Sequence, residues 1–270
     1  MANVMEILLC KWIRPHHFIV LMVSALMVSF FTAYGMSVNS DHVNPLLPYI
    51  SETGTTAPES CIFGLFLNIG AFFSFICMFI RHENYANYTS HRSCHLLNDI
   101  GLFVGFFSAF GLCIVANFQE TNILTVHLIG AGMTFACGVA YCWVHSYLTY
   151  KSYENGLNSR LTIYLRFLIS FFVTVFFIFV FVGASFANLE WANGKTGNST
   201  KMHWTDELPG YNWHLTSTFS EWLMAFFFII FFTTFFQEFR KIRLSVKSLA
   251  LFNVDSPGIL PDSLSEQYLA

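Results

Sequence analysis

The sequence predicts an all-α integral membrane protein, a bundle of six transmembrane helices, and three observations support this. The chain has 270 residues, of which 55% are hydrophobic and only 11% charged. Its apolar residues gather in six long segments that are apolar on all sides, unlike the alternating strands of a membrane barrel. Each segment is 18 to 27 residues long, which is enough for a helix to cross a hydrocarbon core, since this takes roughly 17–25 residues.

Hydropathy places the six spans in one transmembrane domain, residues 1–252. The predicted spans are residues 18–35, 61–80, 96–118, 123–146, 161–187 and 218–236. The tail, residues 253–270, has prolines and few apolar residues, so we expect it to be disordered on the cytosolic side.

Basic residues predict that both termini are cytosolic. With this orientation the lumenal side holds only Lys195 and Lys201, and the two long lumenal loops are residues 36–60 and 188–217. Eleven basic residues then lie on the cytosolic side, as the positive-inside rule requires: Lys11, Arg14, Arg81, Arg92, Lys151, Arg160, Arg166, Arg240, Lys241, Arg243 and Lys247.

Two acceptor triplets for N-glycosylation give this topology a test. Asn198, in "NST", lies in a predicted lumenal loop and should carry a glycan. Asn87, in "NYT", lies on the predicted cytosolic side and should remain unmodified.

The two lumenal loops supply the best candidate site. The first contains "PYISETGTTAPES" (48–60), and the second leads into the last span through "HWTDELPGYNWHLTSTFSEW" (203–222). Carboxylates and histidines that share one membrane face can bind a lipid headgroup or a divalent ion, or act as acid and base. The predicted ligand-binding residues are Glu52, Thr53, Gly54, Glu59, His203, His214 and Glu221.

The alternative interpretation of the second segment is packing. Tryptophan is enriched where membrane meets water, so the segment can instead form part of an aromatic belt. The residues of such a belt are Trp191, Trp204, Trp213 and Trp222.

Polar residues inside the predicted spans give a second hypothesis. His95 and Asp99 share a helix face near the cytosolic side, and with His145 they suggest metal or proton handling. An ion pair at the lipid boundary explains the same residues. His127 lies at the opposite membrane face, which argues against a buried three-histidine metal site, so no metal is expected.

Small residues in the third and fourth spans predict close helix packing. Their side chains let two helix backbones approach each other. They are Gly101, Gly105, Ser108 and Gly111 in the third span, and Gly130, Ala131 and Gly138 in the fourth.

Three segments resemble the damage-regulated autophagy modulators, part of a wider group that includes the lipid-remodelling factor of GPI anchors. They are "PYISETGTTAPESCIFG", "IVANFQ" at 114–119 and "KMHWTDELPGYNWHLTSTFSEW" before the last span. The resemblance runs from the first span to about Phe252 and is strongest to the longer-tailed, second member of the subfamily. The sequence departs at Glu52, where an aspartate is usual, and at Asp99, where a basic residue is expected.

The resemblance implies a non-enzymatic regulator in the lysosomal and late endosomal membrane that promotes autophagy and contributes to apoptosis. The plasma membrane and Golgi are further locations. Implied partners are membrane lipids and autophagy or lysosomal membrane proteins, not nucleic acid, and no cofactor or catalytic residue is carried over. Two alternatives stay open: lipid or ion handling at the acidic lumenal pocket, and an intramembrane lipid-remodelling hydrolase. The sequence contains no GxSxG elbow, P-loop or dinucleotide fingerprint.

Overall fold

The computed structural model describes residues 14–86, 92–153, 159–194 and 203–242. Within these residues every regular element is helical, and six helices are long and apolar enough to cross a membrane. The predicted fold class is therefore confirmed. Asn87, Asn198 and the tail lie outside the described residues, and the side of the membrane on which each terminus lies stays a prediction.

Two of the six membrane-length segments are composites of shorter elements. The fourth, Leu124–Lys151, contains a π-helical turn, and the sixth, Tyr211–Lys241, is broken near its end. The elements are α2 (Pro15–Asn39), η1 (Glu52–Gly54), α3 (Glu59–Ala86), α4 (Arg92–Asn117), α5 (Leu124–Gly132), η2 (Met133–Cys137), α6 (Gly138–Lys151), α7 (Arg160–Gly194), α8 (Tyr211–Thr233) and α9 (Phe236–Lys241).

The helices are longer than the predicted spans. Helix α7 continues past 187 to Gly194, and α8 begins at Tyr211 rather than 218, so helical residues take in both ends of the predicted loop 188–217. Hydropathy marks the thickness of the hydrocarbon layer, whereas a helix can continue among polar headgroups.

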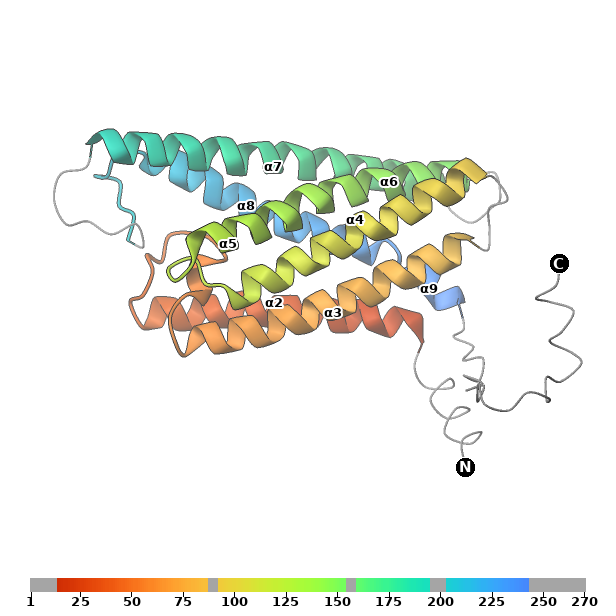
Figure 1. Cartoon of the computed structure of the whole chain (residues 1–270), viewed down its shortest axis with the longest axis horizontal. Helices are drawn as coiled ribbons and strands as arrows, with labels where there is room; N and C mark the ends of the chain where they lie inside the picture. Colours follow the sequence, from red (N-terminus) through yellow and green to blue (C-terminus); the bar gives the residue numbers. More distant parts are fainter. Residues whose placement is uncertain (1–13, 87–91, 154–158, 195–202, 243–270) are drawn as a thin grey trace, which may run out of the picture. The chain divides into compact units, whose positions relative to one another are not determined.

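Neighbours in sequence are mostly neighbours in space (Figure 1). Helix α2 packs along α3, α3 along α4, and α4 against α5, η2 and α6. Helix α6 packs against α7, and α7 lies along α8. The last helices pack less extensively against the first one. Helix α8 approaches α2 at few positions, and the short α9 makes most of the contact with α2.

Glycines explain why α4 and α5 lie so close together. A Cβ atom at Gly111 would lie 2.6 Å from the carbonyl oxygen of Gly130, and one at Gly130 would lie 2.6 Å from the side chain of Ile114. No larger residue fits at either position without moving a helix. The predicted close packing of the third and fourth spans is confirmed.

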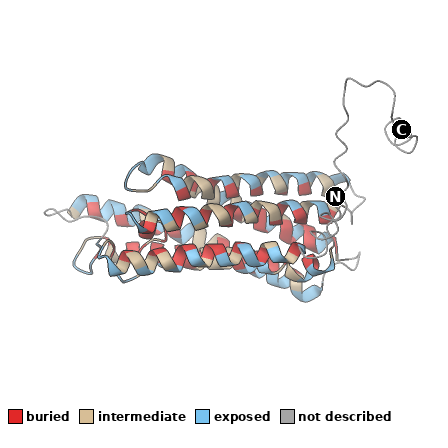
Figure 2. Cartoon of the chain, turned by 90° about the horizontal axis from the view of Figure 1, so that it is seen from below, coloured by how far each residue is buried: buried red, intermediate tan, exposed pale blue. Residues whose placement is uncertain are grey.

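The outer surface of the bundle is apolar, as a lipid-facing surface must be. Figure 2 shows buried residues facing the interior and exposed ones facing outward on each long helix. The exposed side chains include Phe103, Leu161 and Tyr164, each more than 60% accessible. Monomeric soluble proteins rarely expose apolar surface on this scale.

The first loop folds over one end of the bundle, which we call the first-loop end. Val43 and Ile50 are buried there, and Tyr34 of α2 donates a hydrogen bond to the carbonyl oxygen of Pro45 at 2.7 Å. Helix α3 begins at Glu59, directly after Pro58. The loop is therefore part of the packed interior.

Candidate functional site

The structure brings the first loop and α8 together through two of the predicted acids. The backbone N–H of Ile50 donates to Oε2 of Glu221 at 2.7 Å, and the N–H of Tyr49 donates to Oε2 of Glu52 at 2.9 Å. Both carboxylates are buried, with 5% and 7% of Glu52 and Glu221 accessible. Their first role is to satisfy backbone donors that the loop would otherwise leave unpaired away from water.

Thr53 and Gly54 are packing residues. Thr53 is inaccessible, and its hydroxyl donates to the carbonyl oxygen of Ile50 at 2.7 Å. A Cβ atom at Gly54 would lie 2.3 Å from the ring of Phe63, so glycine is needed for the loop to sit on α3. Neither residue presents a free group to a ligand.

Glu59 and His203 do not contact Glu52 or Glu221 in the described part of the chain. Glu59 pairs with Nδ1 of His42, on the same loop. His203 is exposed, and none of the contacts found among the described residues joins it to the acids. The predicted seven-residue site is thus divided: Glu52, Thr53 and Glu221 meet at the Tyr49–Ile50 backbone, whereas Glu59 and His203 do not.

His214 is held between aromatic rings. It stacks on Trp204 with ring centroids 4.4 Å apart and meets Tyr49 edge-on at 5.2 Å. Trp204 in turn packs on Trp191, and both are buried. Trp222 is buried as well, and its indole N–H donates to the carbonyl oxygen of Pro48 at 2.9 Å. These three tryptophans are packed, as the packing interpretation expects, whereas Trp213 is exposed and stacks on Phe186. Their position at the membrane surface stays a prediction.

Burial and like charge set the electrostatics of the loop. Burial raises the pKa of the Glu52 carboxyl well above its usual range, and the nearby carboxylates of Glu120 and Glu221 raise it further. Burial also raises the pKa of the Tyr49 hydroxyl. Glu120 joins this group through Ser51, whose hydroxyl lies 3.4 Å from its Oε2. Three acids therefore meet at the inner side of the loop.

A cavity lies directly beneath the loop. It is lined by α2, α3, α4, the fourth span and α8, and about 120 Å³ of it can hold water-sized molecules. The first loop contributes Ile50 and Ser51 to its wall, and α8 contributes Glu221. The rest is mostly apolar, including Met22, Leu26, Phe30, Phe63, Leu67, Met78, Leu112, Val115, Phe135, Phe228, Ile229 and Phe232.

The hypothesis of a His95–Asp99–His145 site is wrong in its pairing. Asp99 lies 2.8 Å from Nε2 of His82, while His145 is inaccessible and lies against Gly101 of α4. His127 donates through its Nδ1–H to the carbonyl oxygen of Phe118 at 2.7 Å. Among the described residues no group of three or more histidines, cysteines or acids could hold a metal ion.

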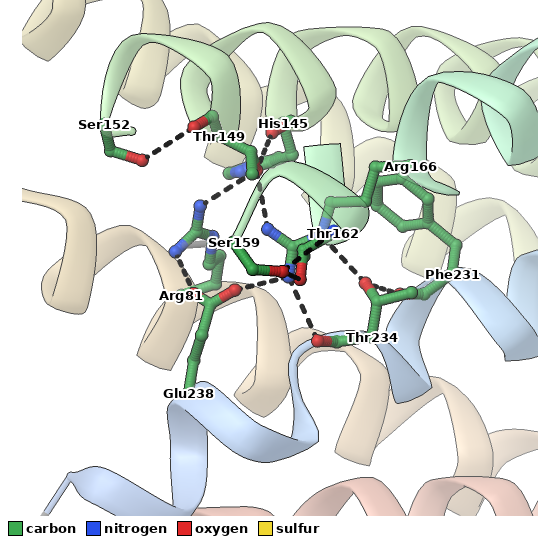
Figure 3. A network of polar contacts seen from close by, with 10 residues as sticks. All are labelled: Arg81, His145, Thr149, Ser152, Ser159, Thr162, Arg166, Phe231, Thr234 and Glu238. Carbon is green, nitrogen blue, oxygen red and sulfur yellow. Dashed lines mark hydrogen bonds and ion pairs between the residues drawn. The ribbon is translucent and has the colours of Figure 1, made fainter. Parts of the chain in front are cut away.

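A second buried polar cluster, which we call the arginine cluster, lies near α9 at the end of the bundle opposite the first loop (Figure 1), and Figure 3 shows it from close by. Arg81 of α3 and Arg166 of α7 donate to Oε2 and Oε1 of Glu238 at 2.6 and 2.5 Å. Arg166 also donates to the hydroxyls of Thr149 and Thr234 at 2.6 and 2.8 Å. Phe235 of the α8–α9 junction packs under both guanidinium groups.

The sequence interpretation missed this cluster. The predicted topology places Arg81 and Arg166 among the cytosolic basic residues and gives them no partner, whereas both side chains are inaccessible. The signal that was available is the position of Arg166, several residues inside an otherwise apolar helix, where a charge needs a partner. Glu238 follows the sixth apolar run and could have been proposed as that partner.

Six membrane-length helices, an apolar outer surface and an internal cavity define a polytopic helical membrane protein. The chain belongs to the Frag1/DRAM/Sfk1/Cwh43P family, whose N-terminal domain it matches over residues 16–242. The resemblance found in the sequence is confirmed.

Named relatives agree with this assignment. DNA damage-regulated autophagy modulator protein 1 of Homo sapiens is 38% identical over 222 residues, 82% of this chain and 89% of that protein. Protein 2 of the same species is 35% identical over 221 residues, 82% of each chain, so the similarity to the second member does not stand out. The modulator of macroautophagy TMEM150B-A of Xenopus laevis is 42% identical over 119 residues, 43% of this chain and 50% of that protein. No solved structure matches the chain significantly.

Proposed function

We propose that this protein modulates autophagy from within the lysosomal and late endosomal membrane, without catalysing a reaction. The observation that carries the proposal is the similarity to proteins named as autophagy modulators over 82% of the chain. The geometry supports a non-enzymatic role, because Glu52, Glu221 and His214 are engaged in backbone and ring contacts. Promotion of apoptosis is part of the same proposal.

The test is autophagic flux in cells that lack the protein. Turnover of an autophagosome marker should fall in knockout cells and recover when the wild-type chain is expressed, and the tagged chain should co-localise with a lysosomal membrane marker. Unchanged flux in the knockout, measured with and without an inhibitor of lysosomal proteolysis, would rule the proposal out.

A second function, lipid handling, is favoured by the apolar cavity beneath the first loop. Among the two ligand classes considered from the sequence, an ion needs several polar ligands, whereas the cavity wall is mostly hydrocarbon. The acids that were to bind the ion are largely occupied by backbone N–H groups.

Purified protein in liposomes tests the second function. We expect movement of fluorescent phospholipid between leaflets, or its binding, without flux of monovalent or divalent cations. Cation flux without any effect on lipid would instead support ion handling.

A further inference from the structure

We propose that the cavity holds one hydrocarbon chain of a membrane lipid, and that the polar end of this lipid donates a hydrogen bond to Glu221. The inference rests on the second proposed function, lipid handling, and names the class of lipid. The ligand is a lipid with an uncharged or cationic headgroup that carries a hydroxyl, amide N–H or amine close to the chain.

The shape of the cavity fits a single chain. Its wall on α3 runs from Phe63 to Met78, about 22 Å along the axis at 1.5 Å per residue. On this measure of volume one water occupies about 10–15 Å³, so 120 Å³ holds on the order of ten water-sized groups. A row of roughly ten methylene groups matches this volume and follows part of the length of that wall.

The wall is mostly apolar and offers water few partners, one of which is the Tyr141 hydroxyl, which has no hydrogen bond within the described part of the chain. The hydroxyls of Ser74, Ser108 and Thr134 line the cavity, but each already donates to a helix carbonyl oxygen at 2.8, 2.8 and 2.9 Å. A buried water needs two to four polar partners. The cavity lies within membrane-length helices, where lipid chains are the abundant molecules.

The fourth span is widened where it meets the cavity. Its π-helical turn, Met133–Cys137, contributes Thr134 and Phe135 to the wall, and the α5 residue Ala131 lies just before it. Single π-turns inside α-helices occur frequently at functional sites.

Glu221 determines which kind of lipid headgroup fits at the first-loop end of the cavity. It lines the cavity, and among the hydrogen bonds of the described residues it is engaged through Oε2 alone, which accepts from Ile50. Its other oxygen is available to accept a donor. A fatty-acid carboxylate has no hydrogen to donate to this oxygen, so such a headgroup fits this end less well than one with a hydroxyl, amide N–H or amine.

The experiment compares two photoactivatable probes with the same diazirine-bearing chain, a monoacylglycerol and a fatty acid. Each is added at neutral pH to the purified full-length protein in detergent, and labelled peptides are identified by mass spectrometry. We expect the monoacylglycerol to label wall residues on at least two helices, Phe135 and Phe228 among them, about tenfold more than the fatty acid does.

Ala131 and Ala136 provide a matched pair of variants. Ala131 of α5 lines the cavity, whereas Ala136, in the π-turn that follows, is exposed on the outer surface. Ala131→Leu should reduce labelling of the wall about tenfold, and Ala136→Leu should leave it unchanged. Ala225→Leu, which narrows the cavity from α8, replaces Ala131→Leu if that variant does not fold.

Glu221→Gln tests the polar end. The amide oxygen can keep the bond to Ile50, while the new NH₂ group can donate to a carboxylate. Labelling by the fatty acid should therefore rise to the level of the monoacylglycerol, and an unchanged preference would overturn the role of Glu221.

Two results would overturn the inference as a whole: equal wall labelling in Ala131→Leu and Ala136→Leu, or labelling confined to outward side chains such as Phe103. Wall labelling without lipid movement in liposomes would keep the inference and remove transport from the second function.

Discussion

Arg81 and Arg166 share one carboxylate, each donating to a different oxygen of Glu238 at 2.6 and 2.5 Å. The three charges come from α3, α7 and α9, so the contact ties together helices that are distant in sequence. Two positive charges face one negative charge, and the uncharged acceptors Thr149 and Thr234 complete the coordination of Arg166.

Removal of Glu238 is the most damaging single change expected in this cluster. Glu238→Ala leaves two inaccessible guanidinium groups close together without a counter-charge, and should lower the stability by about 3–5 kcal/mol. Thermal unfolding in detergent measures the loss. Glu207→Ala removes an exposed carboxylate and should change stability by less than about 0.5 kcal/mol. Equal effects of the two variants would contradict the importance of the cluster.

Arg166→Met should cost less than Glu238→Ala, although it removes more hydrogen bonds. Loss of Arg166 leaves Arg81 and Glu238 as a balanced pair, and methionine fills part of the same apolar space. The unfolding temperatures of Arg166→Met and Glu238→Ala, measured in the same detergent, show which variant is less stable. A variant at Arg166 less stable than the one at Glu238 would show that hydrogen bonds, not charge balance, dominate.

Glu52 should make the protein less stable as pH rises. Its raised pKa means that the folded chain keeps a proton which the unfolded chain releases near the usual carboxyl pKa of 4.5, so stability falls from there up to the pKa of the folded state. Glu52→Gln, which keeps an acceptor for the N–H of Tyr49, should flatten this dependence and stabilise the protein at neutral pH. Unfolding temperatures across the range from acidic to neutral pH measure the effect. A slope equal to that of wild type, or to that of the control Glu207→Gln, would show that Glu52 does not titrate in this way.

Gly54 should be intolerant of any side chain for a reason of packing. The Cβ atom of Gly54→Ala meets the buried ring of Phe63 at 2.3 Å, so we expect a loss of about 1–3 kcal/mol. Thr56→Ala, at an exposed position of the same loop, serves as the control. If Gly54→Ala unfolds like wild type but loses lipid labelling, Gly54 belongs to a binding site after all.

Glycosylation tests the orientation of the chain. The expressed protein should shift in electrophoretic mobility on treatment with an endoglycosidase, and Asn198→Gln should abolish the shift while Asn87→Gln leaves it. A glycan on Asn87 would place the loops on the opposite sides of the membrane from those predicted.

The number of helices was predictable because hydropathy depends only on the side chains of the residues within each segment. Long apolar runs fixed the number of helices, and glycine spacing indicated the contact of α4 with α5, because both depend on local composition. The predicted meeting of the first loop with α8 was likewise right in outline, since Ile50 bonds to Glu221.

Partners of individual polar residues were not predictable in the same way. Asp99 pairs with His82 on α3 rather than with His95 on its own helix, because the packing of α3 against α4 decides which side chains meet. The burial of Arg166 depends on Glu238, which lies near the end of a different span, the sixth. Such pairs can be predicted only when the arrangement of the helices is known, and the composition of the sequence does not give that arrangement.

The π-turn at Met133–Cys137 has a consequence for how the fourth span is read on a helical wheel. One additional residue in a helix with 3.6 residues per turn rotates everything that follows by about 100°. A single wheel drawn through Leu124–Lys151 therefore assigns the wrong direction to Tyr141 and His145 relative to His127. Deletion of one residue within the turn would restore the regular wheel and leave Tyr141 and His145 facing the interior, because the missing residue and the lost π-turn rotate the following helix by equal amounts in opposite senses.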